Sequence, residues 1–385
     1  MFYESIHITM LIFHSFWLWL CVLLLTECSK STFAFRSIDG NAVRYPLRTK
    51  SSTTVLRVAM PFQDDDHIPS SIAPEPTWIR PNQLGQLDPE DAWIAKLDYQ
   101  AFGTEVSALG KELRSSGGTD DVEHLYKLIG WRNVFAILGL ATVWTAPNPL
   151  TILALSTWTY SSWALVAHHT CHGGYNKVDA GDRFKSRQFA QGQINRFVDW
   201  LDWIQTEAWN VEHNRLHHYN LNEERDPDLV QRNLSELREN KDLPVMAKYA
   251  FVLGAMLFWK WFYYAPNTYK ELRINELLLQ KNSGGAQLPE NFDRLQSATI
   301  KDFLDPFSHF GKALRRIAPL DVLLFDVMGP MLVGRFVLLP LVIWAIGGPM
   351  LAQHAIWNLL AAELLTNVHS FVTIVTNHGT CLDRF

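Results

Sequence analysis

Apolar segments that fold back on themselves at uncharged turns constrain this chain more than any other feature. The first joins Val134–Ala146 to Leu150–Ala167 through Pro147, Asn148 and Pro149. As a helix rising about 1.5 Å per residue, Leu150–Ala167 would be about 27 Å long, close to the hydrocarbon thickness of a bilayer. A buried helical hairpin of a soluble protein is the alternative, but its turn would usually be polar and charged. The uncharged turn therefore favours a transmembrane hairpin.

A second apolar hairpin is expected near the end of the sequence. Val327–Ile346 forms one arm, Met350–Thr376 forms the other, and a Gly-Gly-Pro turn at 347–349 separates them. Arg335 interrupts the first arm and Glu363 the second. Because a charge is costly in lipid, each of these side chains is expected to face protein or to lie near an interface.

The segment between the hairpins is expected to form a cap outside the lipid. Within it, Tyr249–Trp259 is apolar but too short to span, and Lys260 follows it, so we expect a helix lying in the membrane interface. The chain contains 15 Trp, a residue that gathers at membrane–water boundaries. The fold class predicted is all-α and integral to a membrane: two transmembrane helical hairpins with a helical extramembrane cap. The net charge of -5 argues against a nucleic-acid partner.

The N-terminal region is typical of a targeting sequence. Ile8–Thr26 is apolar, as in a signal peptide, and the stretch after it is basic, rich in Ser and Thr, and poor in acids. This order resembles the bipartite plastid presequence of algae with complex plastids, so residues 1–60 are predicted to be a signal and transit presequence. The alternative is an anchor helix followed by a linker. We expect a linker at 61–86 and the membrane domain at 87–385.

Two groups of closely spaced histidines lie in the expected cap. The first contains His168, His169 and His172, and the second contains His213, His217 and His218. Residues i and i+4 of a helix share one face, so two imidazoles at this spacing can reach one metal ion. The adjacent rings of the second group point in different directions, which suits a site that holds more than one metal.

The expected topology brings these histidines to one side of the membrane, together with His378 after the second hairpin. The candidate metal ligands are His168, His172, His213, His217, His218 and His378. Neutral imidazole suits several transition metals, but a structural zinc needs only four ligands and usually includes Cys. The histidines therefore indicate a dinuclear site, for which di-iron is the usual choice in dioxygen chemistry. Beside a membrane, the expected substrate is a lipid acyl chain.

Other polar residues near the histidine groups are weaker candidates for a role in the metal site. The residues expected to support the ligands are His169, Glu212, Asn214, His369 and Asn377. Glu212 and Asn214 flank His213 and are expected to orient imidazole N–H groups. His369 is expected to pack or to support a ligand. Cys171 is interpreted as a small packing residue.

The second histidine group carries a resemblance to a known family. Glu212–His218, followed by Asn222 and the Asp-Pro-Asp turn at 226–228, resembles the second histidine box of membrane fatty acid desaturases. His168–Gly174 is similar to their first box, and Glu363–Phe385 is similar to the segment that closes their fourth transmembrane helix. The resemblance covers roughly residues 120 to 385. The second box is specific, whereas the first alone would be weak.

This resemblance implies a four-helix membrane fold, a di-iron centre held by the candidate histidines, and a reaction with O2. It also implies a separate electron donor, either ferredoxin in a plastid or cytochrome b5 in the endoplasmic reticulum; we expect the plastid. The family has a third histidine box after its fourth helix, and the sequence stops at Phe385 without one. We therefore expect the printed chain to bind iron incompletely and to be inactive alone.

Three functions follow from these observations. The leading hypothesis is an acyl-lipid desaturase that inserts a double bond with O2. A hydroxylase of the same histidine-rich family is the close alternative, and the sequence does not separate the two. A truncated membrane remnant without catalytic activity is the third.

Overall fold

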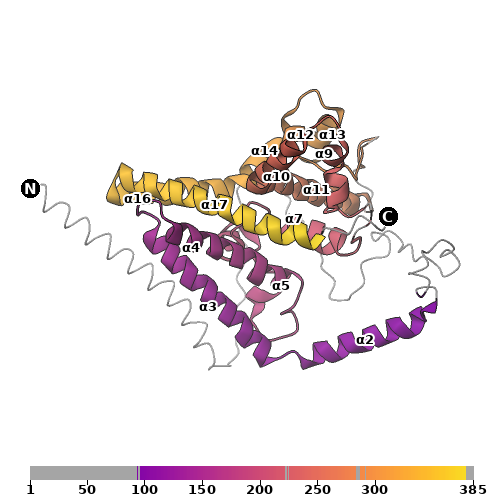
Figure 1. Ribbon diagram of the computed structural model, residues 1–385. Helices are drawn as coiled ribbons and strands as arrows, with labels where there is room; N and C mark the ends of the chain where they lie inside the picture. Colours follow the sequence, from indigo (N-terminus) through magenta and orange to yellow (C-terminus); the bar gives the residue numbers. More distant parts are fainter. Residues whose placement is uncertain are drawn as a thin grey trace, which may run out of the picture. The chain divides into compact units, whose positions relative to one another are not determined.

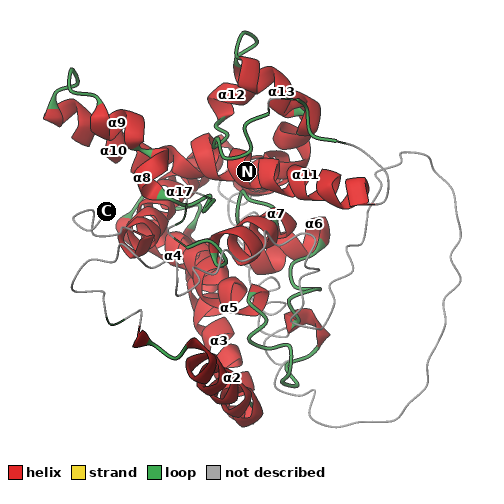
Figure 2. Cartoon of the chain, turned by 90° about the vertical axis from the view of Figure 1, so that its right-hand side faces the viewer, coloured by secondary structure: helices red, strands yellow, loops and turns green. Residues whose placement is uncertain are grey.

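The computed structural model describes Trp93 and residues 96–221, 223, 225–282, 287–290 and 292–378. Within this part of the chain the regular elements are all helices and none is a strand (Figure 2). The predicted presequence at 1–60 and the predicted linker at 61–86 lie outside the described residues. The chain divides into two compact units, of which one comprises 35–118 and the other holds all later elements.

The described part of the smaller unit contains one long helix, α2 (Tyr99–Ser116). The side chain of Asp98 caps it by accepting a hydrogen bond of 3.0 Å from the backbone N–H of Ala101. The helix ends before Gly117, whose extended backbone cannot continue it. Such an N-cap satisfies one of the four N–H groups that a helix start leaves open.

The larger unit is built from helices, several of which continue through π-helical segments, and it also contains the short 3₁₀ helix η5. In chain order they are α3 (Thr119–Thr142), α4 (Pro149–Tyr160), η4 (Ser161–Ala167), α5 (His168–Cys171), η5 (Asp182–Phe184), α6 (Gly192–Asn195), η6 (Arg196–Trp200), α7 (Thr206–Trp209), η7 (Asn210–His217), α8 (Val230–Asn233), α9 (Ser235–Glu239), α10 (Val245–Trp259), η8 (Lys260–Tyr264), α11 (Ala265–Asn282), α12 (Ile300–Leu304), α13 (His309–Ile317), α14 (Leu320–Val322), η9 (Leu323–Met328), α15 (Gly329–Met331), η10 (Leu332–Leu338), α16 (Leu339–Gly347) and α17 (Pro349–His378).

Three helices in the described part of the chain are long and apolar enough to cross a membrane: Pro149–Cys171, Val245–Lys281 and Leu320–Gly347. The first and third coincide with arms of the predicted hairpins. The second was expected to be a short interfacial helix ending near Trp259, but the structure continues it without a break through η8 and α11. The two-hairpin transmembrane arrangement is therefore not confirmed, whereas the all-helical class is.

Helices α3, α4 and α17 pack side by side (Figure 1). Asn148 starts α4 as its N-cap and accepts a hydrogen bond of 3.0 Å from the backbone N–H of Thr151. Asn358 of α17 holds the same turn, because its side-chain N–H group donates to the carbonyls of Val143 and Thr145 at 2.9 Å each. The uncharged turn is thus stabilised by amide side chains, which satisfy backbone groups that two helix ends would leave open.

Two ion pairs are buried inside the bundle. Arg335 and Glu363 form a buried ion pair in the protein interior, with 3.2 Å between Nη1 and Oε2. Of the two positions expected from the sequence, facing protein or near an interface, both side chains therefore take the first. Lys260 forms a second ion pair with Asp202, and both side chains are fully buried. Lys260 therefore does not mark the end of an apolar helix, because its charge is compensated inside the protein.

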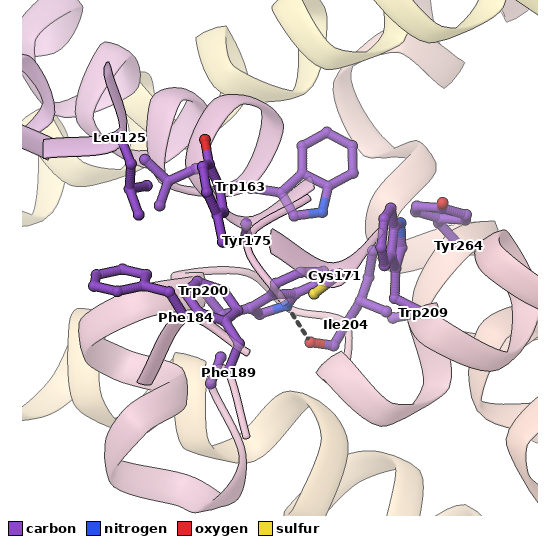
Figure 3. Close-up of a cluster of buried hydrophobic side chains, with 14 of the residues drawn as sticks. Leu125, Trp163, Cys171, Tyr175, Phe184, Phe189, Trp200, Ile204, Trp209 and Tyr264 are labelled. Carbon is purple, nitrogen blue, oxygen red and sulfur yellow. Dashed lines mark hydrogen bonds between the residues drawn. The ribbon is translucent and has the colours of Figure 1, made fainter. Parts of the chain in front are cut away.

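The core beside the first histidine group is rich in aromatic residues (Figure 3). Its labelled members are Leu125, Trp163, Cys171, Tyr175, Phe184, Phe189, Trp200, Ile204, Trp209 and Tyr264. The indole N–H of Trp200 donates to the carbonyl of Ile204 at 2.8 Å, so its polar group is satisfied although the side chain is fully buried. Cys171 is buried in this core, which confirms its prediction as a packing residue. The core joins the end of α5 to the end of α7.

Candidate metal centre

The first histidine group lies at the C-terminal end of the helix that runs through α4, η4 and α5. Gly173 has a φ of 80° and ends the helix directly after His172. Its N–H donates to the carbonyl of Thr170 at 2.9 Å, and the N–H of Gly174 donates to that of His169 at 3.1 Å. This pair of bonds is a Schellman cap, which requires a left-handed residue that glycine adopts at little cost. His168 and His172 thus occupy one rigid final turn.

The second histidine group lies on a helix that widens from α7 into the π-helical segment η7. The N–H of His218 donates to the carbonyl of His213 at 3.1 Å, five residues earlier rather than four. A π turn contains one residue more than an α turn, so His217 and His218 both remain neighbours of His213. Their ring centroids lie 5.2 Å and 4.6 Å from that of His213, respectively.

Imidazoles from the two groups converge. The Nε2 atom of His213 lies 3.1 Å from Nε2 of His168 and 3.1 Å from Nε2 of His218. With His172, these residues offer four ring nitrogens that all lie within 4.8 Å of one another. Each ring nitrogen presents either one N–H or one lone pair, so Nε2 of His213 cannot form hydrogen bonds with both neighbours at once.

A metal ion fits this donor set. Two nitrogens bound at about 2.1 Å and about 90° to each other lie about 3.0 Å apart, which agrees with the Nε2 separations. The described residues therefore show that His168, His172, His213 and His218 could hold a metal ion. Imidazole suits iron as it suits zinc, copper and nickel.

Two contacts fix the second helix against the end of the first. Trp209 is buried; its ring stacks on that of His213 of the same helix with centroids 4.2 Å apart, and it meets the ring of His168 of the first helix edge-on at 5.5 Å. The side-chain amide of Asn214 donates to the carbonyl of Cys171 at 2.9 Å. Asn214 therefore joins the two histidine-bearing helices through the backbone, and in the described hydrogen bonds it does not orient an imidazole as expected.

His217 is oriented by a carboxylate. Its Nδ1 lies 2.8 Å from Oδ1 of Asp226, and both side chains are buried. A carboxylate that holds Nδ1–H leaves Nε2 as the nitrogen that faces a metal. His217 belongs to a second group of possible ligands, which it forms with His213 and Asp228.

The environment keeps two of the rings neutral. Burial, followed by the proximity of His168 and His218, lowers the pKa of His172 to about 4. The same causes lower the pKa of His213 well below its usual value. Burial also acts to lower the pKa of His217, but the hydrogen bond to Asp226 and the nearby Asp228 outweigh it and raise that pKa. Neutral rings are the form that binds a metal.

Glu212 lies behind the histidines in a fully buried position. Burial, and then the neighbouring carboxyl of Asp228, raise its pKa well above the usual value. His213 Nδ1 lacks a hydrogen-bond partner in the described part of the chain, so Glu212 does not orient that ring as expected.

The remaining predicted residues are not among the histidines that converge in the described part of the chain. His169 is exposed, with its ring centroid 6.2 Å from that of His168, and it is not one of the possible ligands that converge. His369 packs edge-on against Tyr160 at 6.1 Å, which agrees with a packing role. His378 and Asn377 end α17, but their side chains lie outside the described residues.

Three functional candidates were missed from the sequence. Asp226 and Asp228 were interpreted only as part of a turn, and Trp209 was not singled out. Two acids shortly after a pair of adjacent histidines are the signal that could have indicated a carboxylate near the ligands. No comparable signal points to Trp209, since its contact with His213 depends on the helix pitch.

Comparison of the chain with protein-family models, with curated proteins and with solved structures finds no match. The site is therefore interpreted from its own geometry.

Proposed function

We propose that this protein is a membrane-bound, iron-dependent oxidoreductase that desaturates lipid acyl chains with O2. The observation that carries the proposal is the convergence of His168, His172, His213 and His218 from two helices. The first of these helices is itself long and apolar enough to cross a membrane. An oxidising metal centre held at the end of such a helix would lie close to lipid.

The chain's own residues would prepare the site in three ways. The Schellman cap at Gly173 fixes the last turn of the first helix, and the Asn214 bond to Cys171 joins that helix to the second. The lowered pKa values of His172 and His213 keep those rings neutral at physiological pH. Trp209 covers one face of His213 and excludes water from it. Bound iron would supply the power to oxidise an unactivated C–H bond with O2.

An external electron donor, ferredoxin or cytochrome b5, is part of this proposal, as is a plastid location. Support for the plastid comes from the composition of residues 1–60 alone. Hydroxylation of the acyl chain is the alternative outcome of the same oxidising centre. Its product gains an oxygen atom, whereas a desaturated product loses two hydrogens, so mass spectrometry of the lipids separates them.

The test measures metal identity and lipid products for the chain extended past Phe385 by a third histidine box, because the printed chain is expected to be inactive without one. The protein is expressed in a eukaryotic host, purified in detergent, and analysed for iron, zinc and copper, while the host fatty acids are profiled. We expect iron in the wild-type protein and loss of iron in His213→Ala. The control is His309→Gln, an exposed histidine at the start of α13. Zinc in place of iron, or iron retained in His213→Ala, would contradict the proposal.

Fatty-acid profiling tests the reaction itself. New double bonds in host lipids that disappear in His213→Ala would support the desaturase. New hydroxyl groups in the host lipids would instead support the hydroxylase. An iron-loaded protein that leaves the lipids unchanged, even with ferredoxin and cytochrome b5 supplied, would contradict an oxidoreductase that acts on acyl chains.

A further inference from the structure

Exposed apolar side chains lie where α12 is joined to α13. The two helices pack against each other, and a short loop at 305–308 connects them (Figure 2). Leu304, at the end of α12, is 59% exposed, and Phe307, in the loop, is 83% exposed, whereas the adjacent Phe303 is buried. Exposed apolar side chains that cluster in this way mark a surface that contacts a protein or a membrane.

Hydrogen bonds hold this connection in one shape. The guanidinium of Arg315 donates from Nη1 to three backbone carbonyls, at 3.0 Å, 2.9 Å and 2.9 Å, which belong to Asp302, Phe303 and Asp305. Oδ1 of Asp305 accepts a hydrogen bond of 2.8 Å from the backbone N–H of Phe307. The exposure of Phe307 is therefore imposed by bonded backbone on both sides of it.

The exposed face of α13 is basic. Lys312 and Arg316 are exposed and stand one helical turn apart, while α13 contains no acidic residue. Residues 301–317 contain four basic and two acidic residues, a net charge of +2 in a chain whose net charge is -5. The two acids accept hydrogen bonds from backbone N–H groups, and they are Asp302 and Asp305. The segment thus combines exposed cations with exposed apolar side chains.

Helix α13 stands directly before a possible membrane span. It ends at Ile317, and two residues later begins the helix Leu320–Gly347, which is long and apolar enough to cross a membrane. Phe325, near the start of that helix, is 74% exposed, so lipid that covers it would lie close to α13. Basic residues beside a span attract anionic headgroups, and apolar side chains near them enter the boundary between headgroups and acyl chains.

We propose that α12, α13 and the loop between them form an anchor that binds an anionic lipid surface. Leu304 and Phe307 enter the boundary between headgroups and acyl chains, and Lys312 and Arg316 bind the headgroups. A bilayer is favoured over an acidic protein partner because the chain ties this segment to a span two residues away. The inference uses the membrane location in the proposed function, and it is independent of the metal and of acyl oxidation.

The experiment measures how deep residue 307 lies when the chain is reconstituted in vesicles. A nitroxide is attached to Phe307→Cys in a chain that also carries Cys21→Ser, Cys28→Ser and Cys381→Ser, while the buried Cys171 remains. Electron paramagnetic resonance compares collisions of the label with O2, which concentrates in lipid, and with a water-soluble nickel chelate. We expect the label to meet O2 preferentially in vesicles that contain phosphatidylglycerol, and this preference to fall in vesicles of phosphatidylcholine alone.

Lys312→Gln/Arg316→Gln in the labelled chain tests the contact with headgroups. Each cation near an anionic surface favours binding about fivefold, so the equilibrium between the inserted and the water-exposed loop should shift about 30-fold towards water. Lys177→Gln/Lys281→Gln changes two exposed lysines outside α12 and α13, and this matched control should leave the depth of the label unchanged. Far-ultraviolet circular dichroism checks that each variant is folded.

The outcomes separate the anchor from the proposed function. A label that remains accessible to nickel in anionic vesicles would overturn the anchor, as would an equal depth in both lipids and in the charge variant. Shielding from both probes only after ferredoxin or cytochrome b5 is added would assign this surface to the electron donor instead. Release of the chain from vesicles by a carbonate wash would overturn the membrane location and the anchor together. Absence of iron or of lipid oxidation would overturn the proposed function and leave the anchor intact.

Discussion

Arg335 and Glu363 meet in the protein interior, with 3.2 Å between Nη1 and Oε2, although they come from two different helices. The indole N–H of Trp203 donates to the other oxygen of Glu363 at 2.7 Å. Three separate parts of the chain therefore meet at one carboxylate. The pair explains how two charged residues can lie within apolar sequences without facing lipid.

Removing one partner of this pair should destabilise the protein strongly. Glu363→Leu leaves the Arg335 charge buried without compensation, which costs about 3–5 kcal/mol. The double variant Arg335→Met/Glu363→Leu should recover most of that loss, because it removes both charges. Thermal unfolding in detergent measures the effect. Glu239→Ala, which breaks an exposed pair with Arg238, is the control. Equal stability of Glu363→Leu and this control would contradict the prediction.

Asn214→Ala should weaken both stability and metal binding. It removes the bond to the Cys171 carbonyl, at a cost of about 1–2 kcal/mol for a buried group left unpaired. Metal affinity should fall about tenfold, since the two histidine-bearing helices lose their direct link. Co²⁺ titration and thermal unfolding measure the two effects. Asn195→Ala is the matched control, because Asn195 is exposed and bonds only within its own helical turn. Metal binding by Asn214→Ala as tight as that of the control would refute this role.

Asp226→Asn should loosen His217. The amide can still accept a hydrogen bond from Nδ1–H, but it lacks the charge that makes the ring more basic, so the pKa of His217 should fall. Loss of such a partner typically lowers metal affinity about 10–100-fold. The measurement compares the dissociation constant for Co²⁺ in this variant with that in a control, Asp182→Asn, which changes an exposed aspartate paired with Lys185. An affinity within twofold of that control would show that Asp226 does not position a ligand.

The metal-free protein should lose stability as the pH falls. The folded-state pKa values of His172 and His213 lie below those of the unfolded chain, so the unfolded state binds more protons in acid. The stabilisation is fully present above about pH 6.5, the ordinary value for histidine. It is lost progressively as the pH falls from there towards the folded value, which is about 4 for His172.

Thermal unfolding of the metal-free chain between about pH 7.5 and about pH 4.5 tests this dependence, because this range spans the ordinary pKa of histidine. Carboxylates contribute to acid unfolding as well, so the comparison is with the double variant His172→Gln/His213→Gln. The unfolding temperature of that variant should depend less on pH than that of the wild type. If the unfolding temperature depended on pH to the same extent in both proteins, these rings would not titrate as described.

The parts of the site that depend on local sequence could be predicted. His168 and His172 share a helical turn, and Gly173 and Gly174 end the helix directly after them. Their spacing and the two glycines contain the information that this geometry needs. The meeting of this turn with His213 was predicted only from the expected topology, yet the structure brings the rings together.

The parts that depend on tertiary contacts could not be predicted. Lys260 was interpreted as the end of an apolar segment, because its partner Asp202 is 58 residues away in the chain. Asp226 was interpreted as a turn residue, because the return of the loop onto His217 is not visible in any local pattern. The π turn at η7 was also missed, since helical spacing was taken as that of an α-helix.

The additional residue in η7 makes the order of the rings sensitive to chain length. Deleting any one of residues 214–216 would turn the last imidazole around the helix axis by one residue, which is about 100° in an α-helix. It would then occupy the direction that His217 has now, and the arrangement around His168 would lose a nitrogen. A single-codon deletion, which preserves every histidine, would thus disable the centre as effectively as replacing one of them.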